Sequence, residues 1–248
     1  MLRSLAERLS RNVVLRRKLP PDLGGHFIYV SPECALRFWY PKLEYADNAH
    51  LLDIARRFVP NNSIVWDVGA NVGLFSFSAA ARAKSVFAFE PDPWLASLCS
   101  RSASKITNVL ILPVAVTNRI DVGELQIAQR GRASNFMSGF GNSQTGGVRR
   151  SQPVMTVTLD WLAERFPIPD VVKIDVEGAE RQVLEGGTSL LKQASPILIC
   201  EVASANSHWV TNFLLSLDYK FVDQHLDPTS AAVADIVALP SRFQTTGS

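Results

Sequence analysis

The fold is decided by one short stretch, Val65-Trp66-Asp67-Val68-Gly69-Ala70-Asn71-Val72-Gly73. The apolar residues 63–66 that enter it are typical of a buried strand, and the pattern of residues 74–81 that leaves it predicts a helix. Open parallel sheets bind their ligands at such strand-to-helix turns. Glycines remove side chains where the backbone turns sharply or a ligand approaches closely. The residues expected on this turn, and therefore expected to bind a cofactor, are Asp67, Gly69, Asn71 and Gly73.

An acidic residue follows the next apolar run at the spacing of a ribose-binding site. Residues 85–89 are typical of a second strand, and Glu90-Pro91-Asp92 begins 17 residues beyond Gly73. An acid at this strand tip is placed to accept hydrogen bonds from both hydroxyls of a ribose. We expect Glu90 to bind the ribose of a cofactor, and its adenine to lie against Phe89, Pro91 and the tip of the third strand near Ala115.

The turn also argues against cofactors that carry phosphate. The dinucleotide pattern Gly-x-Gly-x-x-Gly and the P-loop pattern are both absent. Asp67 adds a negative charge that repels phosphate and suits an ammonium group. A ribose joined to an amino acid, without phosphate, describes S-adenosyl-L-methionine (SAM), which is the predicted cofactor. Two alternatives remain open, a nicotinamide-dependent oxidoreductase and a non-catalytic scaffold protein with a SAM-binding fold.

The composition is that of a globular protein with one large α/β domain. The chain has 248 residues, 47% of them hydrophobic and 19% charged, with a formal net charge of +2 that gives no reason to expect nucleic acid as a partner. The three cysteines lack disulfide or metal-site spacing. No signal peptide and no membrane-spanning run is visible, so we expect a cytoplasmic location.

The first 18 residues are unevenly basic, with six Lys and Arg side chains against one Glu. Leu2, Leu5, Leu9 and Val13 have helical spacing, so one hypothesis is a basic amphipathic helix that contacts an anionic membrane surface or a partner. A solvated helix or a frayed terminus is the alternative. A hairpin of residues 26–30 and 34–40 is expected next. Residues 1–46 would then form an N-terminal extension, and residues 47–248 the main domain.

From residue 47 onward the pattern alternates helices and strands, as in a parallel sheet covered on both faces. Parallel strands are expected at about 63–68, 84–89, 109–114, 171–175 and 197–202, and a closing hairpin at 219–222 and 235–239. Helices are expected at about 47–58, 73–82, 93–103, 158–166, 179–193 and 206–217. Residues 118–156 are rich in glycine and are expected to form a long mobile loop, flanked by short strands at about 123–128 and 153–157. This loop would close over the acceptor with Arg130, Arg132, Asn135, Arg149 and Arg150.

A second group of acids follows the strand expected at 171–175. Asp175 and Glu177 should project from the same sheet edge as Gly69 and Glu90, where two acids reduce stability unless they act on a ligand. We expect Asp175 nearest the transferred group, positioning the acceptor or taking its proton, and Glu177 orienting acceptor or donor. Glu180 is explained by the helix dipole, and Lys173 is expected to pair with a neighbouring acid.

The roles of two further groups are left open. His208 follows the strand expected at 197–202, and its ordinary pKa of about 6.5 suits a general base. A capping or packing role for His208 is the alternative. No metal is expected, although a divalent ion held by Asp175, Glu177 and Glu201 is the alternative role for these acids.

The motifs together resemble those of the FkbM-type methyltransferases, SAM-dependent enzymes that mostly methylate oxygen. The resemblance covers about residues 51–201 and rests on residues 67–73, Phe89-Glu90-Pro91, Thr158-Leu159-Asp160, residues 173–180 and residues 196–201. It implies a Rossmann-like α/β fold, with a seven-stranded, mostly parallel sheet, helices on both faces and an antiparallel last strand. It also implies methylation of a hydroxyl on a small molecule or a sugar-containing acceptor, without identifying that acceptor.

Overall fold

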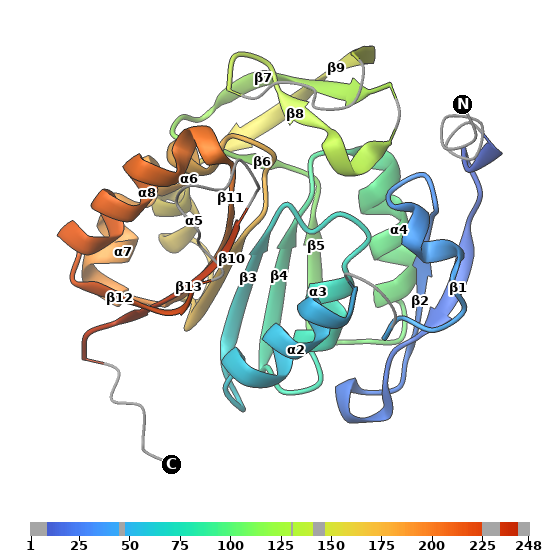
Figure 1. The fold of residues 1–248 in the computed structure, drawn as a ribbon, viewed down its shortest axis with the longest axis horizontal. Coiled ribbons are helices and arrows are strands. Elements are labelled where there is room, and N and C mark those ends of the chain that lie inside the picture. The colour runs from blue at the N-terminus through green and yellow to red at the C-terminus, as the bar shows by residue number, and fades with distance from the viewer. Residues whose placement is uncertain (1–8, 45–47, 130, 141–146, 225–233, 243–248) are drawn as a thin grey trace.

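The central element is a sheet of seven strands, seen in a computed structural model that describes residues 9–44, 48–129, 131–140, 147–224 and 234–242 (Figure 1). Five neighbouring strands run parallel, and β13 runs antiparallel to both its neighbours. The prediction of a seven-stranded, mostly parallel sheet is confirmed. In spatial order the strands are β12 (Tyr219–Gln224), β13 (Ala234–Pro240), β11 (Ile197–Val202), β10 (Val171–Ile174), β3 (Ile64–Val68), β4 (Ser85–Phe89) and β5 (Val109–Leu112).

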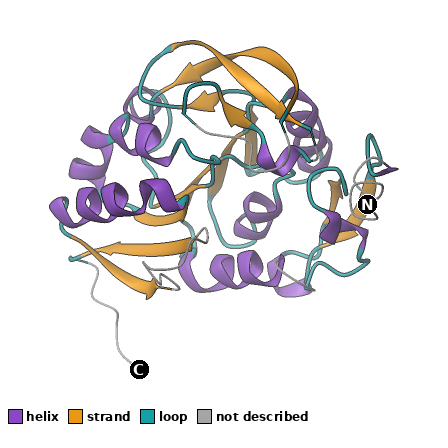
Figure 2. Cartoon of the chain, turned by 45° about the horizontal axis from the view of Figure 1, so that its top comes forward, coloured by secondary structure: helices purple, strands orange, loops and turns teal. Residues whose placement is uncertain are grey.

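Helices cover both faces of this sheet because its strands are apolar on both sides (Figure 2). In β3, Trp66 and Val68 pack on one face, and Val65 packs on the other. The first face is covered by α5 (Leu159–Ala163), α6 (Glu180–Glu185), α7 (Thr188–Ala194) and α8 (Ser204–Ser216). The second is covered by α2 (Asn48–Phe58), α3 (Leu74–Ala79) and α4 (Pro93–Ala103). No helix within the described ranges is long and apolar enough to cross a membrane.

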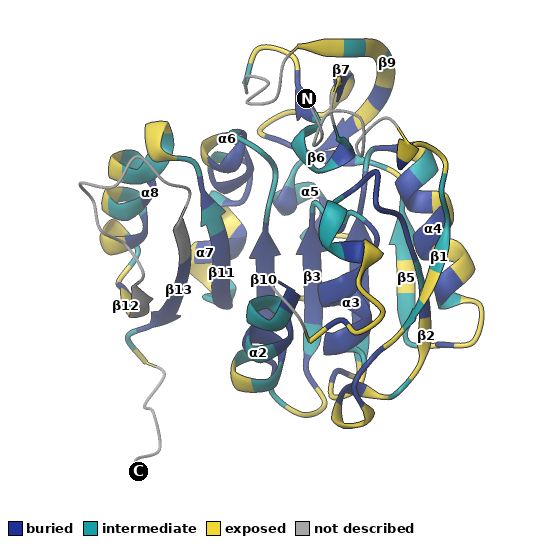
Figure 3. Cartoon of the chain, turned by 45° about the vertical axis from the view of Figure 1, so that its right-hand side comes forward, coloured by how far each residue is buried: buried dark blue, intermediate teal, exposed yellow. Residues whose placement is uncertain are grey.

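The expected long loop at 118–156 is instead largely a second sheet, a correction to the prediction, although the strands expected at about 123–128 and 153–157 are both present. Four strands form this small sheet, β6 (Ala115–Val116), β7 (Asp121–Ala128), β8 (Phe136–Met137) and β9 (Val148–Val157). Leu125, Ile127 and Val154 form an apolar core of its own, whereas residues 141–146 lie outside the described residues. The small sheet lies above the carboxyl ends of the parallel strands (Figure 3). It therefore forms a roof over the edge where a ligand is expected.

The N-terminal extension also differs from the expected hairpin. β2 (Phe27–Val30) pairs with β1 (Leu15–Lys18), not with residues 34–40, which contain the short 3-10 helix η2 (Leu36–Trp39). The reason is visible at Arg17, whose guanidinium donates to the carbonyls of Phe38 and Tyr40 and so holds that segment without a strand ladder. Residues 1–8 of the hypothesised helix lie outside the described residues, and residues 15–18 are a strand. The division of the chain at residues 46 and 47 stays a prediction.

Candidate functional site

The turn after β3 is shaped by a close approach between two strand tips. Gly69 has a φ of 81°, and a Cβ atom placed on it would lie 1.8 Å from the carbonyl oxygen of Asp175. Its amide and that of Ala70 both donate to the carbonyl of Phe89, at 2.9 and 3.1 Å. Gly73, with a φ of 79°, precedes α3. The turn therefore brings the tips of β3, β4 and β10 together.

Glu90 lies beneath this turn, where its carboxylate is fixed by two backbone amides. Oε2 accepts from the amide of Asn71 at 2.7 Å, and Oε1 accepts from the amide of Asp92 at 2.9 Å. Burial raises the pKa of Glu90 to about 8, although the two amides act in the opposite direction. Each carboxylate oxygen has a second lone pair, so the group retains the capacity to bind two ribose hydroxyls.

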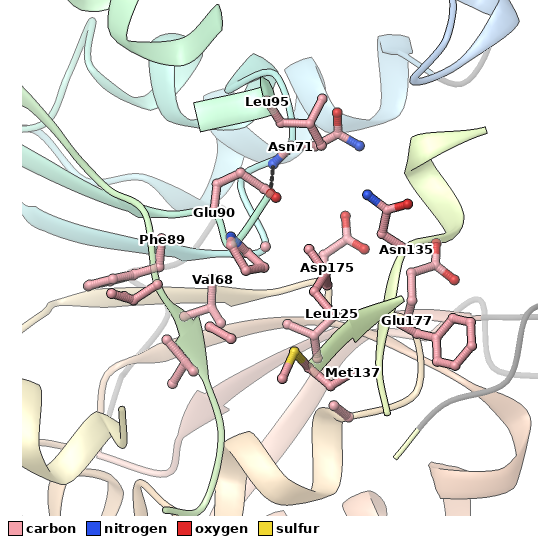
Figure 4. A pocket seen from close by; sticks show the side chains of 18 of the residues that line it. Val68, Asn71, Phe89, Glu90, Leu95, Leu125, Asn135, Met137, Asp175 and Glu177 are labelled. Carbon is pink, nitrogen blue, oxygen red and sulfur yellow. Dashed lines mark hydrogen bonds between the residues drawn. The ribbon is translucent and has the colours of Figure 1, made fainter. Parts of the chain in front are cut away.

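A pocket opens beside Glu90 and contains most of the predicted cofactor residues (Figure 4). Gly69, Asn71, Glu90, Pro91 and Ala115 line it, whereas Asp67 and Gly73 do not. Phe89 also lines the pocket, but the pattern of the sequence did not reveal the apolar walls that come from α4 and the roof, Leu95, Leu125, Phe136 and Met137. These walls suit a flat apolar group such as adenine.

Asp67 is buried under the turn and belongs to a charged group that reaches the pocket. Its Oδ2 accepts from the Ser76 hydroxyl at 2.5 Å, and its Oδ1 lies 3.8 Å from Lys173 Nζ. Lys173 also pairs with Asp175 at 2.9 Å, which confirms the expected pairing of this lysine with an acid. Burial acts to lower the pKa of Lys173, but Asp175 and Asp67 outweigh it and raise the pKa. Direct contact between Asp67 and a ligand in the pocket is therefore not what the structure favours.

Asp175 and Glu177 both line the pocket, as their predicted position at the strand tip requires. Figure 4 shows their side chains and that of Asn135 directed into a common space. Glu177 has a φ of 50°, a backbone conformation that costs energy and is frequent at functional sites. Burial, and then the charges of Asp175, Glu201 and Glu180, raise the pKa of Glu177 to about 8. No hydrogen bond or ion pair joins its carboxylate to another described residue.

The predicted role of His208 as a general base fits the structure less well. His208 is exposed on α8, where Nε2 lies 3.0 Å from Asn212 Nδ2, and it does not line the pocket. The helix begins at Ser204, and His208 therefore lies a full turn into it.

Within the described ranges, no group of three or more His, Cys, Asp or Glu side chains is placed to hold a metal ion. Glu180 binds the amide of Gly178 and the side chain of Asn206, and so stabilises the turn after β10.

The arginines expected to close over an acceptor are mostly engaged elsewhere. Arg132 pairs with Glu33 at 3.0 Å and with Asp92, and Arg149 pairs with Glu33 at 2.8 Å. Asn135 donates to Asp92 at 2.9 Å, and Arg130 lies outside the described residues. Glu33, Asp92, Arg132, Asn135 and Arg149 form what we term the Glu33 cluster. It fastens the roof to the N-terminal extension and to the start of α4, a role for Glu33 that no local sequence signal indicated.

Comparison with known proteins shows which family of enzymes this chain belongs to. A family model described as the Methyltransferase FkbM domain matches residues 67–223. The chain belongs to the FkbM methyltransferase family. One relative is the Hexuronic acid methyltransferase AglP of Haloferax volcanii, 30% identical over 155 residues, a match that covers 62% of this chain and 62% of the relative. The chain thus spans less than two thirds of that relative.

Solved structures show the same fold. The methyltransferase FkbM of Methylobacillus flagellatus superimposes with a TM-score of 0.53 at 16% identity, over 79% of this chain and 47% of that one. SMU.1697c of Streptococcus mutans, solved in complex with S-adenosylhomocysteine (SAH), has a TM-score of 0.50 at 12% identity, over 79% of this chain and 98% of that one. SAM is the cofactor that the FkbM family indicates here, as predicted.

The residues of the pocket fit this cofactor. The side-chain oxygen of Asn71 is buried with no hydrogen-bond partner among the described residues, so it is available to a donor on a ligand. Glu90 retains lone pairs for a ribose, and Gly69 lets the turn lie directly against the tip of β10, so that both line the pocket. The excess of carboxylates over cations suits a cofactor that carries positive charge.

The contact at Gly69 gives a test of the turn. Gly69→Ala introduces a methyl group against the Asp175 backbone, and we expect it to lower the free energy of unfolding by roughly 1–3 kcal/mol more than the backbone strain alone. Gly139→Ala is the matched control, because Gly139 has a φ of 85° but no atom within 4 Å of a Cβ. Urea denaturation measures both variants. Equal losses would show that the close approach is not present in solution.

The raised pKa of Glu177 gives a test by pH. Between about 4.5 and 8 the folded state keeps the proton that the unfolded state loses, so this group's contribution to stability falls as the pH rises. Glu177→Gln should match the wild type at pH 5 and be more stable at pH 8, by on the order of 1–3 kcal/mol after allowance for solvent screening. Thermal unfolding at both pH values measures the difference, with exposed Glu164→Gln as control. A difference that does not depend on pH would contradict the burial of this carboxyl.

Proposed function

We propose that this chain is a SAM-dependent O-methyltransferase that acts on a hydroxyl of an acidic sugar, free or within a glycan. The observation that carries the proposal is the presence of Asp175 and Glu177 in the same pocket as Glu90. The acidic sugar is suggested by the relative named as a hexuronic acid methyltransferase. A non-catalytic protein that binds SAM remains the alternative, and it is excluded only if turnover is observed.

The site offers each function that methyl transfer to a hydroxyl requires. SAM, when bound, supplies an electrophilic methyl group. Glu90 is positioned to bind the ribose, and Leu95 and Met137 contribute apolar walls beside it. The roof contributes Asn135 to the lining of the pocket, and its side chain is held there by Asp92 and the amide of Ala128 (Figure 4).

We infer that Asp175 and Glu177 have each other's expected roles. Oδ2 of Asp175 is held by Lys173 at 2.9 Å, which fixes the position of this carboxylate and suits it to orient an acceptor. Glu177 has a pKa of about 8 and no such partner, and a base near neutrality is more effective. We therefore assign proton removal to Glu177 and orientation of the acceptor hydroxyl to Asp175.

Binding of the cofactor is tested at Glu90. Glu90→Gln removes the carboxylate that receives the ribose hydroxyls, and we expect SAH to bind about 10- to 150-fold more weakly, the equivalent of roughly 1.5–3 kcal/mol. Isothermal titration calorimetry measures the dissociation constant, and a thermal melt confirms that the variant folds. Glu124→Gln, on the exposed side of β7, is the control. An unchanged dissociation constant for Glu90→Gln would remove the ribose assignment.

Catalysis is tested by an acceptor screen with mass spectrometry. We expect a gain of one methyl group on a hexuronic acid or a glycan that contains one, and no gain on the matching neutral hexose. Glu177→Gln should lower kcat by about 100-fold or more with little change in SAH binding. A product cleaved by mild alkali would be an ester of the sugar carboxylate and would overturn the hydroxyl assignment. SAH binding without turnover on any acceptor would support the non-catalytic alternative.

A further inference from the structure

The outward face of the β1–β2 ribbon carries a row of cations and aromatic rings. The strand register pairs Arg16 with Tyr29 and Lys18 with Phe27, so these four side chains lie on one face. Their neighbours Ile28 and Val30 point the other way and are buried in the core. The ribbon lies at the edge of the molecule beside α4 (Figure 1). Arg101 of α4 lies over the Tyr29 ring and so joins this face.

These side chains form a continuous ladder. The guanidinium of Arg101 lies 4.1 Å from the centre of the Tyr29 ring, and that of Arg16 lies 6.0 Å from the same ring and 4.5 Å from the Phe27 ring. Lys18 Nζ lies 5.9 Å from the Phe27 ring. Phe27 nevertheless remains 50% exposed, a large value for a phenylalanine. We refer to Arg16, Lys18, Phe27, Tyr29 and Arg101 as the basic–aromatic face.

No acid within the described residues neutralises this face locally. β1, β2 and α4 contain no Asp or Glu. Of the acids on adjoining segments, Asp22 pairs with Arg56, and Glu33 is buried between Arg132 and Arg149. The cations therefore stand as uncompensated positive charge beside an exposed apolar ring.

We propose that the basic–aromatic face docks the protein on an anionic lipid bilayer. Lys and Arg bind the anionic headgroups, while an exposed aromatic ring enters the interfacial layer. Nucleic acid is disfavoured because its bases stack on open ring faces, and here Arg16 and Arg101 cover those faces. The contact is thus made by a strand face, and not by the amphipathic helix that the spacing of residues 1–18 suggested. It is independent of methyl transfer.

The test is sedimentation of the full chain with phosphatidylcholine vesicles that contain or lack phosphatidylglycerol. We expect binding only to the anionic vesicles, weakened by salt. Each cation near such a surface contributes about fivefold, so Arg16→Ser/Lys18→Ser should lower the partition coefficient roughly 25-fold. Phe27→Ser should lower binding in high salt as well as in low salt, because its contribution is apolar.

The matched control is Arg82→Ser/Lys84→Ser, which removes the same two charges at the same spacing from an exposed turn before β4. This variant should bind vesicles like the wild type. Three results would each overturn the proposal: no binding of the wild type to anionic vesicles, equal losses in the two double variants, or binding of RNA as tight as binding of vesicles. Circular dichroism confirms that each variant is folded.

Discussion

The site depends on the close approach of the Gly69 backbone to the carbonyl of Asp175, which only a residue without a side chain permits. This contact joins the turn after β3 to the tip of β10, two strands that are neighbours in the sheet although about 100 residues separate them. The cofactor turn and the acid pair then line the same pocket. Parallel pairing places β3 and β10 side by side, and the glycine allows their two tips to approach closely enough for one ligand to touch both.

Electrostatics around the pocket follow from an excess of buried acid. Asp67, Glu90 and Glu177 each have a raised pKa, with burial the largest cause, and Lys173 is the cation shared by Asp67 and Asp175. Such a site holds a positively charged ligand better than a neutral one of the same shape. The same acids reduce the stability of the empty protein, as is common where function and stability conflict.

The parts of the site that could be predicted are those that depend on strand ends. Glu90, Asp175 and Glu177 follow apolar runs, and in a parallel sheet the carboxyl ends of such runs meet at one edge. His208 was misplaced because its side-chain direction depends on the residue at which α8 begins, which a pattern locates only approximately. Glu33 was missed because it meets Arg132 through tertiary packing, 99 residues away. Likewise, β1 was read as helix, since pairing with β2 outweighed local spacing.

The Glu33 cluster has a consequence for how the protein folds. Its contacts join segments separated by 99, 116 and 40 residues, so each requires closure of a long loop before any stabilisation is gained. The β3–β4 and β4–β5 pairs have short connections, whereas the β3–β10 pair closes a loop as long as those of the cluster. Attachment of the roof and joining of the two halves of the central sheet therefore both require long-range closure, and both slow folding relative to the local pairs.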